Sequence, residues 1–340
     1  MREITINRVQ EGQRLDRFLA RCLPGASSGF LPKMLRKKNI KLNDARAEGS
    51  EKLKEGDRIQ VYVSEETYEK FAGESPAAPA SGKPEKPIRE DCGLRSRIRI
   101  LYKDRDVVAF HKPAGLLSQK SASGDDSLND YLLDLCRKEG WLDEESMLYF
   151  HPSVANRLDR NTSGIVLCGI STTGLQHLSS ALRDRNLAKY YLALVCGQVT
   201  GSRTLKGYLR KDRDKNLVTY SSVMKKGFAP IETGYEVLAS GKEISLLKVR
   251  LITGKSHQIR AHLAAEGFPV LGDNKYGDRE MNRKIRTALG ISRHLLHCCR
   301  VDFGSHYGGL VIRDGLPEDF EKTMEYFGLA LSRDRREDLE

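Results

Sequence analysis

Hydrophobic positions in residues 1–66 follow short helical and alternating patterns. Four apolar residues in segment 14–23 recur at i, i+3, i+4 and i+8, which predicts one face of a helix. A second helix is predicted over 29–38. Alternation of apolar and polar residues predicts strands at 4–6, 39–43 and 58–63. We therefore expect a small N-terminal module that combines helices and strands.

The hydrophobic pattern disappears over residues 67–95, where Pro, Ala, Gly, Ser and charged residues dominate. This composition predicts a flexible linker between the module and a longer part, residues 96–330. The last ten residues, 331–340, are highly charged and predict a frayed tail.

The longer part mixes predicted strands and helices. Ser127 can cap a helix that runs to residue 135, and Ser256 can cap another that runs to 265 and stops at Gly267. A third helix is expected over 173–183. Segment 99–115 is predicted to form a strand, a turn, a second strand and then a Pro/Gly corner, and further strands are predicted at 165–167, 190–195 and 244–252. The order lacks a steady strand–helix–strand rhythm, so we predict the α+β class rather than a doubly wound sheet.

Composition changes the picture mainly through charge. Lys and Arg number 57 against 46 Asp and Glu, a net charge of +11. This balance suggests a polyanionic partner, although a soluble protein that is merely basic fits equally well. No apolar run approaches the roughly 20 residues of a membrane span. Seven scattered cysteines without a CxxC pair predict reduced thiols in a cytoplasmic protein.

A basic stretch lies in the second half of the module, with no acidic residue between residues 33 and 43. Alone it indicates a solvated helix face. The order of elements around it, however, resembles an S4 RNA-binding domain, which implies that this edge contacts RNA phosphates. The residues concerned are Lys33, Arg36, Lys37, Lys38 and Lys41.

Asp159 is the main candidate for chemistry, because Arg157 and Arg160 flank it and favour the ionised carboxylate. Such a carboxylate is suited to act as a nucleophile or a base. The alternative is an ordinary surface ion pair. The small residues 161–164 predict a turn that can present Asp159 from the edge of a strand. On a helix starting at residue 256, His257 and Arg260 share one face, free for substrate or for Asp159.

His257 and His262 are five residues apart, whereas helical zinc pairs are four apart, usually with a Glu. We therefore interpret both as packing or RNA-contacting residues and predict no metal site. The sequence also contains no GxGxxG or GxxxxGK[ST] motif for a nucleotide.

Four ordered blocks resemble the RluA-type pseudouridine synthases. The first is RLDRNTSG, residues 157–164, which matches the RLD, Arg or Lys, any residue, TSG core of that family. The other blocks are ILYKD (100–104) with KPAGL (112–116), KYYLALV (189–195) with Gly197, and TGKSHQIR (253–260) with GFPVLGD (267–273) and Tyr276-Gly277. The resemblance covers about residues 98–310, and an S4-like module with a linker is a common front end in the family.

The resemblance implies a fold with a mixed, largely antiparallel sheet and an enzyme that isomerises uridine in RNA. Asp159 matches the essential aspartate, Tyr191 the tyrosine that stacks on uracil, and Arg260 the arginine that pairs with the aspartate. Tyr190 is a neighbour that a strand would turn to the opposite face. The reaction requires base flipping but no cofactor or metal.

Further substrate contacts are expected from residues of the same blocks. They are Arg157, Arg160, Thr162, Lys189, Lys255 and His257. Three positions depart from the family pattern: Asn156 replaces a common histidine, His111 a common asparagine and Lys255 an arginine, so the bidentate fork of that arginine is lost.

The expected partner is RNA, with large-subunit ribosomal RNA favoured over transfer RNA, and the protein is expected to be a monomer. The alternatives are a catalytically silent RNA-binding or ribosome-assembly protein and a hydrolase that uses Asp159 on a small molecule.

Overall fold

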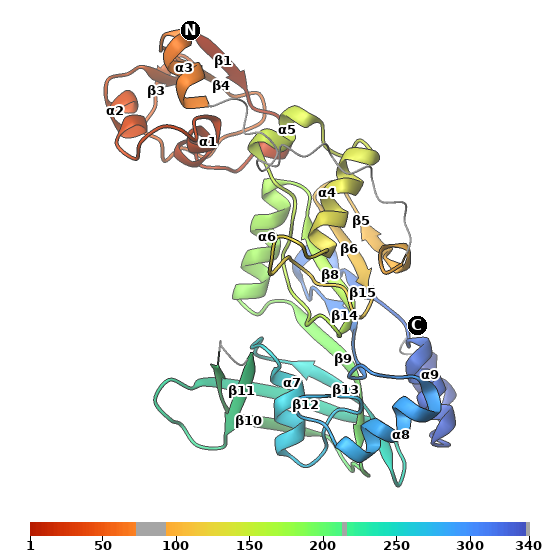
Figure 1. Ribbon diagram of the computed structural model, residues 1–340. Helices are drawn as coiled ribbons and strands as arrows, with labels where there is room; N and C mark the ends of the chain where they lie inside the picture. The colour runs from red at the N-terminus through yellow and green to blue at the C-terminus, as the bar shows by residue number, and fades with distance from the viewer. Residues whose placement is uncertain (73–92, 213–215, 338–340) are drawn as a thin grey trace.

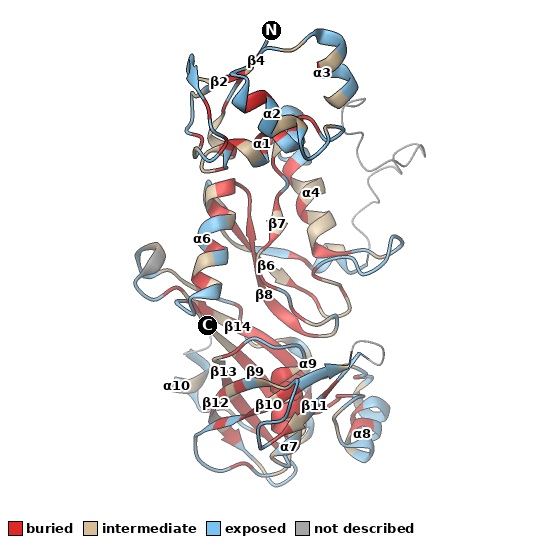
Figure 2. Cartoon of the chain, turned by 90° about the vertical axis from the view of Figure 1, so that its left-hand side faces the viewer, coloured by how far each residue is buried: buried red, intermediate tan, exposed pale blue. Residues whose placement is uncertain are grey.

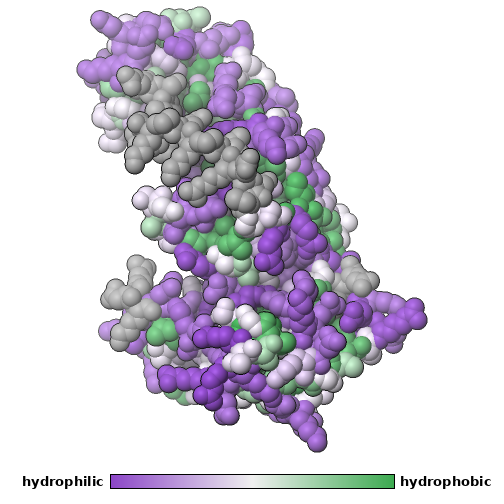
Figure 3. Space-filling model, turned by 45° about the vertical axis from the view of Figure 1, so that its right-hand side comes forward, coloured by the Kyte–Doolittle hydropathy of each residue, from purple (hydrophilic) through white to green (hydrophobic). Residues whose placement is uncertain are grey.

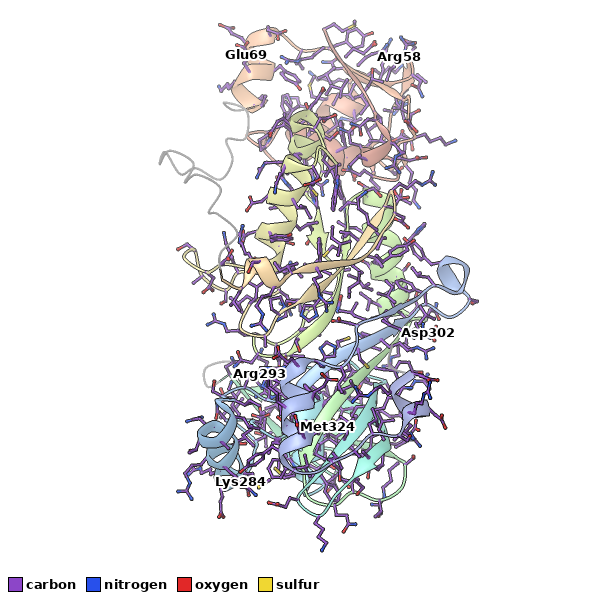
Figure 4. The ribbon with its side chains drawn as sticks, turned by 90° about the vertical axis from the view of Figure 1, so that its right-hand side faces the viewer. Arg58, Glu69, Lys284, Arg293, Asp302 and Met324 are labelled. Atoms are coloured by element: carbon purple, nitrogen blue, oxygen red, sulfur yellow. The ribbon has the colours of Figure 1, made fainter. Side chains whose placement is uncertain are left out.

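The computed structural model describes residues 1–72, 93–212 and 216–337. The molecule is elongated, with the N-terminal module at one end (Figure 1). Arg58 and Glu69 lie at that end, whereas Lys284 and Met324 lie towards the other (Figure 4). Hydrophilic residues cover much of the face in Figure 3, with smaller hydrophobic patches between them.

The N-terminal module is a four-stranded antiparallel sheet in the order β1-β4-β2-β3, covered by helices. Three predicted apolar positions of α1, Leu15, Phe18 and Leu19, are fully buried in its core, which confirms the helical spacing. The elements are β1 (Arg2–Thr5), η1 (Arg8–Gln10), α1 (Leu15–Cys22), α2 (Phe30–Arg36), β2 (Ile40–Leu42), β3 (Ala45–Arg46), β4 (Arg58–Val61) and α3 (Glu65–Ala72).

Helix α3 corrects the start of the predicted linker. Residues 67–72 are helical, because Tyr68 is buried in the module core and Phe71 packs against it. The remainder of the predicted linker, apart from residues 93–95, lies outside the described residues.

The longer part is built on an eleven-stranded sheet. The main path is β11-β10-β12-β13-β9-β14-β8-β6-β5, with β15 beside β14 and β7 beside β8. The pairs are antiparallel except β8 with β14, which confirms a mixed, largely antiparallel α+β fold. The strands are β5 (Arg99–Lys103), β6 (Val107–Lys112), β7 (Ser153–Val154), β8 (Ser163–Gly169), β9 (Ala188–Cys196), β10 (Arg203–Asp212), β11 (Leu217–Ser221), β12 (Ala229–Ser240), β13 (Ile244–Leu251), β14 (Leu296–Asp302) and β15 (Val311–Arg313).

Helices flank this sheet, and α4, α5, α6 and α8 each start after a residue whose side chain caps the helix. Ser127 caps α4 as predicted, since its hydroxyl accepts a hydrogen bond from the backbone of Asp130. Part of the predicted frayed tail is helical in α10, and residues 338–340 lie outside the described residues. The helices are η2 (Arg95–Arg97), α4 (Leu128–Lys138), α5 (Glu144–Tyr149), α6 (Thr172–Arg183), α7 (Gln258–Ala265), α8 (Arg279–Leu289), η3 (His306–Gly309), α9 (Glu318–Tyr326) and α10 (Arg333–Glu337).

The start of α7 differs from the prediction. The helix begins at Gln258, and the residue before it, His257, has left-handed backbone angles, so Ser256 is not the N-cap. The cause is the Gln258 side chain, whose Oε1 accepts hydrogen bonds from Thr253 Oγ1 at 2.9 Å and from Lys255 N at 3.1 Å. These bonds hold residues 253–257 as a turn instead of a first helical turn.

The module packs directly on the longer part through η1 and α1, which contact α5 and α6 (Figure 1). Asn7 Nδ2 donates to Ser146 Oγ at 2.7 Å, and Gln176 Nε2 donates to the Gly12 carbonyl at 2.9 Å. The rings of Phe18 and Tyr149 lie 5.1 Å apart. Buried residues therefore continue from the large sheet towards the module (Figure 2).

Gly164 sets the close approach of β8 to β14. Its φ is +114°, and a Cβ atom there would lie 2.3 Å from the Cys298 carbonyl oxygen. Only glycine fits this position without displacing backbone. The turn that precedes β8, which carries Asp159, is thus fixed relative to β14.

Across the described ranges, no helix combines the length and the apolar composition needed to cross a membrane. The six cysteines among these residues are free thiols, and all but Cys196 are buried. Cys92 lies outside the described residues.

Candidate active site

One cleft of about 1160 Å³ brings the sequence blocks together. It is lined by the turn before β8, the start of β9, the start of α7 and the β10–β11 hairpin. All nine candidate residues of the longer part line it: Arg157, Asp159, Arg160, Thr162, Lys189, Tyr191, Lys255, His257 and Arg260.

Asp159 and Arg260 form the ion pair that the resemblance implied. Arg260 Nη1 donates to Asp159 Oδ2 at 2.9 Å, and the Asp159 side chain is 28% exposed. Arg260 also donates from Nε and Nη2 to both oxygens of Asp273, at 2.6 and 2.8 Å. The two-pronged bond to Asp273 leaves Nη1 directed at Asp159.

Asp273 is fully buried and is the anchor of this arrangement. Burial alone raises the pKa of Asp273, but the hydrogen bonds and charge of Arg260 outweigh it and leave the pKa lowered. Backbone amides of Lys275 and Tyr276 also donate to Asp273 Oδ1. Of the two carboxylates that bind Arg260, Asp159 is therefore the one that lines the cleft.

Tyr191 lies on β9 and lines the cleft next to Cys298 of β14. Burial, and then the neighbouring Cys298, raise the pKa of the Tyr191 phenol, so the ring stays neutral at neutral pH. Tyr190 packs in a different cluster, near the cations of Lys248 and Arg300. The alternation predicted for these two tyrosines is confirmed.

Among the described residues, the cation paired with Asp159 is not one of the two arginines beside it in sequence. Arg157 and Arg160 are both exposed at the cleft. Arg160 Nη2 lies 3.5 Å from Asp125 Oδ1. The close cation of Asp159 is thus Arg260, and both flanking arginines remain accessible to a ligand.

Thr162 is buried, in contrast to the direct substrate contact predicted for it. Its backbone N donates to the Asp159 carbonyl at 3.0 Å, and its hydroxyl is 2.7 Å from His294 Nε2. Burial lowers the pKa of His294 to about 3, so that ring is neutral. These contacts support a positioning role of Thr162 in the turn that carries Asp159.

Lys189, Lys255 and His257 surround the same space. Lys189 is half-buried, and burial lowers its pKa, whereas Lys255 is exposed. His257 is 8% exposed, with Nε2 3.9 Å from Asp159 Oδ2. Burial lowers the pKa of His257, against the opposing effect of Asp159.

Sequence reasoning assigned no role to several residues of this region. Lys112 is fully buried and donates to the carbonyls of Pro113, Leu116 and Arg160, which ties the KPAGL corner to the Asp159 turn. The motif blocks of the sequence include Lys112, Asp273 and Tyr276. The blocks therefore marked these residues as candidates but did not indicate their contacts.

His262 is fully buried beside Thr233 and Tyr220, which confirms the packing interpretation. Within the described part of the chain, no group of three or more His, Cys, Asp and Glu side chains is arranged to hold a metal ion.

The chain is similar to known pseudouridine synthases. The family described as RNA pseudouridylate synthase matches residues 106–265. The chain is 28% identical over 321 residues to ribosomal large subunit pseudouridine synthase C of Pasteurella multocida, covering 94% of this chain and 90% of that protein. The protein of the same name from Escherichia coli is also 28% identical, with 93% and 92% covered.

The solved structure titled human RNA pseudouridylate synthase domain containing 4 has the same fold, with a TM-score of 0.57 at 20% identity. It covers 69% of this chain and 94% of its own. The family model and these relatives together support a pseudouridine synthase, an isomerase that acts on RNA. The chain's similarity to relatives along more than nine-tenths of its length supports the RluA type within that family.

Proposed function

We propose that this protein converts specific uridines of large-subunit ribosomal RNA to pseudouridine. The observation that carries the proposal is the Asp159–Arg260–Asp273 arrangement at the floor of a cleft lined by cations. The names of the relatives support ribosomal RNA over transfer RNA as the substrate.

The reaction breaks the bond from N1 of uracil to C1′ of ribose and forms a bond from C5 to C1′. The C5 proton is lost, and N1 gains a proton, so the product is an isomer of the substrate. The target nucleotide must leave its stack to reach the cleft. Asp159 attacks C1′ as a nucleophile or removes the 2′ proton as a base, and both routes need the ionised carboxylate that Arg260 stabilises.

Tyr191 supplies a stacking face for the flipped base, a contact worth roughly 1–3 kcal/mol in single-strand binders. Its raised phenol pKa means that it faces uracil as a neutral ring. The exposed Arg157, Arg160 and Lys255 then neutralise phosphates of the bound strand.

The N-terminal module supplies a second RNA contact in this proposal. Lys33, Arg36, Lys37 and Lys38 are exposed on and after α2, and Lys41 is half-buried beside Tyr62. None of the five has an acidic partner among the described residues. Cations without an acidic partner can neutralise the phosphates of an RNA backbone.

We test the function by tritium release from RNA labelled with 5-³H-uridine, because the C5 hydrogen leaves during isomerisation. Asp159→Asn is expected to abolish release from large-subunit ribosomal RNA. The matched control is Glu337→Gln, which alters an exposed ion pair with Arg333 in α10, outside the residues that line the cleft, and should retain full activity.

The alternatives give different outcomes in the same assay. Release from transfer RNA alone would identify the other substrate. No release from any cellular RNA would support a silent RNA-binding or assembly protein, and turnover of a small molecule without RNA would support a hydrolase. A monomer in the cytoplasm remains our expectation, and the free cysteines agree with a reducing compartment.

A further inference from the structure

The β10–β11 hairpin is bonded to the segment that follows α7. Lys275 Nζ donates to the Asn216 carbonyl at 2.6 Å, and Val218 N donates to the Tyr276 hydroxyl at 2.9 Å. Lys211 and Asn216 of this hairpin line the cleft. The wall of the cleft formed by the hairpin is therefore connected to the residues around Arg260.

The Tyr276 hydroxyl has a second partner, His257 Nδ1, at 2.9 Å. A backbone N–H is only a donor, so the phenol oxygen accepts from Val218. The single phenol hydrogen then goes to His257 Nδ1, the one acceptor at hydrogen-bond distance from it among the described residues. Because Nδ1 accepts this hydrogen bond, a neutral His257 carries its own hydrogen on Nε2.

His257 Nε2 faces the reacting carboxylate but does not bond to it. The 3.9 Å to Asp159 Oδ2 exceeds a hydrogen bond, and within the described ranges no other acceptor lies at bonding distance. The Nε2–H is therefore free to donate to a bound uracil carbonyl, or to Asp159 after a small movement.

Tyr276 also contacts the partner of Asp159. Its ring centre lies 5.4 Å from the Arg260 guanidinium carbon, a cation–π distance. Its backbone N donates to Asp273 Oδ1 at 3.2 Å, the carboxylate that holds Arg260. One residue thus contacts both side chains that face Asp159.

We propose that Tyr276 is a positioning residue that holds His257 with its Nε2–H directed at the reacting uridine, anchored by the β10–β11 hairpin. The proposal rests on the proposed function for its substrate. The state of the His257 ring can nevertheless be measured without RNA, so the two ideas fail separately.

The direct test is the tautomer of His257, read from long-range ¹H–¹⁵N NMR spectra of the full-length protein without RNA and assigned with His257→Gln. We expect a protonated Nε2 and an unprotonated Nδ1, and loss of this single form in Tyr276→Phe. Tyr220→Phe is the matched control, because Tyr220 shares the same small apolar cluster but contacts His262. A protonated Nδ1 in the unsubstituted protein, or an unchanged ring in Tyr276→Phe, overturns the proposal.

The kinetic test separates positioning from a loss of folding. Tyr276→Phe should lower kcat for tritium release about tenfold with KM changed less than twofold, since one hydrogen bond is lost while the ring over Arg260 remains. His257→Gln keeps an N–H near the Nε2 position, and adding Tyr276→Phe to it should lower kcat no further. An unchanged kcat in Tyr276→Phe, or additive losses in the double variant, contradicts the proposal.

Discussion

The N-terminal module and the catalytic cleft are both rich in basic residues but hold them in different surroundings. On α2 and the turn after it, Lys33, Lys37 and Lys38 are exposed and have no acidic partner among the described residues. In the cleft, Arg260 is 6% exposed with three hydrogen bonds to two carboxylates, and Lys112 is fully buried against three carbonyls. Exposed cations attract a polyanion, and salt weakens this attraction. Buried cations instead hold the groups that they bind in fixed positions.

The largest effect is expected for Arg260→Met, which removes the cation between Asp159 and Asp273. Leaving the buried carboxylate of Asp273 without its partner should destabilise the protein by about 3–5 kcal/mol. The kcat for tritium release should fall by on the order of 10²–10³, a typical cost of removing a fixed catalytic charge. Arg333→Met, at an exposed pair in α10, is the control for urea unfolding and for activity.

The same variant should show an altered pH dependence of stability. The pKa of Asp273 is lowered in the folded protein, so its ion pair with Arg260 stabilises the fold at pH values above the ordinary pKa near 4. This stabilisation is lost as the pH falls through the pKa that Asp273 has in the folded protein. Without Arg260, burial raises that pKa. The stability deficit of Arg260→Met should therefore shrink between pH 8 and pH 5, and a constant deficit would contradict this account.

Lys112→Met tests the buried lysine. Burial, and then repulsion by Arg293, lower the pKa of Lys112 to about 7, whereas the unfolded chain keeps the ordinary value near 10.4. Between about pH 7 and about pH 10.4 the unfolded state binds more protons than the folded state, so the unfolding free energy of the unsubstituted protein rises with pH. Lys112→Met has no lysine at this position, so its unfolding free energy does not show this rise. We expect their difference to be about 2 kcal/mol larger at pH 9 than at pH 7; a pH-independent difference would argue against a buried, titrating Lys112.

The exposed lysines should behave in the opposite way. Substituting Lys33, Lys37 and Lys38 together by Gln should leave the unfolding free energy within about 0.5 kcal/mol of its original value. The slope of log affinity for RNA against log salt should become shallower by about 2, as three phosphate contacts are lost. Urea unfolding measures the unfolding free energy, and filter binding over a salt series measures the slope.

A control with the same net charge uses lysines of the catalytic part. Lys242, Lys284 and Lys322 are exposed or half-exposed, and their substitution by Gln should leave the salt slope unchanged. Equal slopes of log affinity against log salt for the two triple variants would contradict an RNA-binding role of the module.

The smallest effect is expected at the contact between the two regions. Arg8→Ala removes an ion pair with Asp106 whose side chains are 37% and 18% exposed. Surface pairs of this kind contribute about 0–1 kcal/mol, so we expect an unfolding free energy lower by about 0.5 kcal/mol and less than threefold change in kcat/KM. Arg2→Ala, which breaks a pair inside the module, is the control.

Periodicity and motif blocks predicted much of this structure. The buried face of α1, the cap of α4 and the opposite orientations of Tyr190 and Tyr191 all follow from local spacing. The short sequence blocks supplied nine candidate residues, and all nine line the cleft.

The remainder depends on contacts between distant segments, which local spacing does not contain. The start of α7 shifted because the Gln258 side chain bonds Thr253, and Thr162 was buried by His294, which is 132 residues away. Asp273 was visible as part of a block, yet its bond to Arg260 requires the loop after α7 to fold back on that helix.

The place of β14 in the sheet has a consequence for the order of folding during synthesis. Residues 296–302 insert between β9 and β8, so strands made more than a hundred residues earlier meet only through a late segment. Domains generally fold as the chain emerges, but here the turn with Asp159 cannot settle against Gly164 and Cys298 until β14 has been made. A nascent chain shorter than this already contains every strand and helix of the module, while uridine modification must wait for nearly the whole polypeptide.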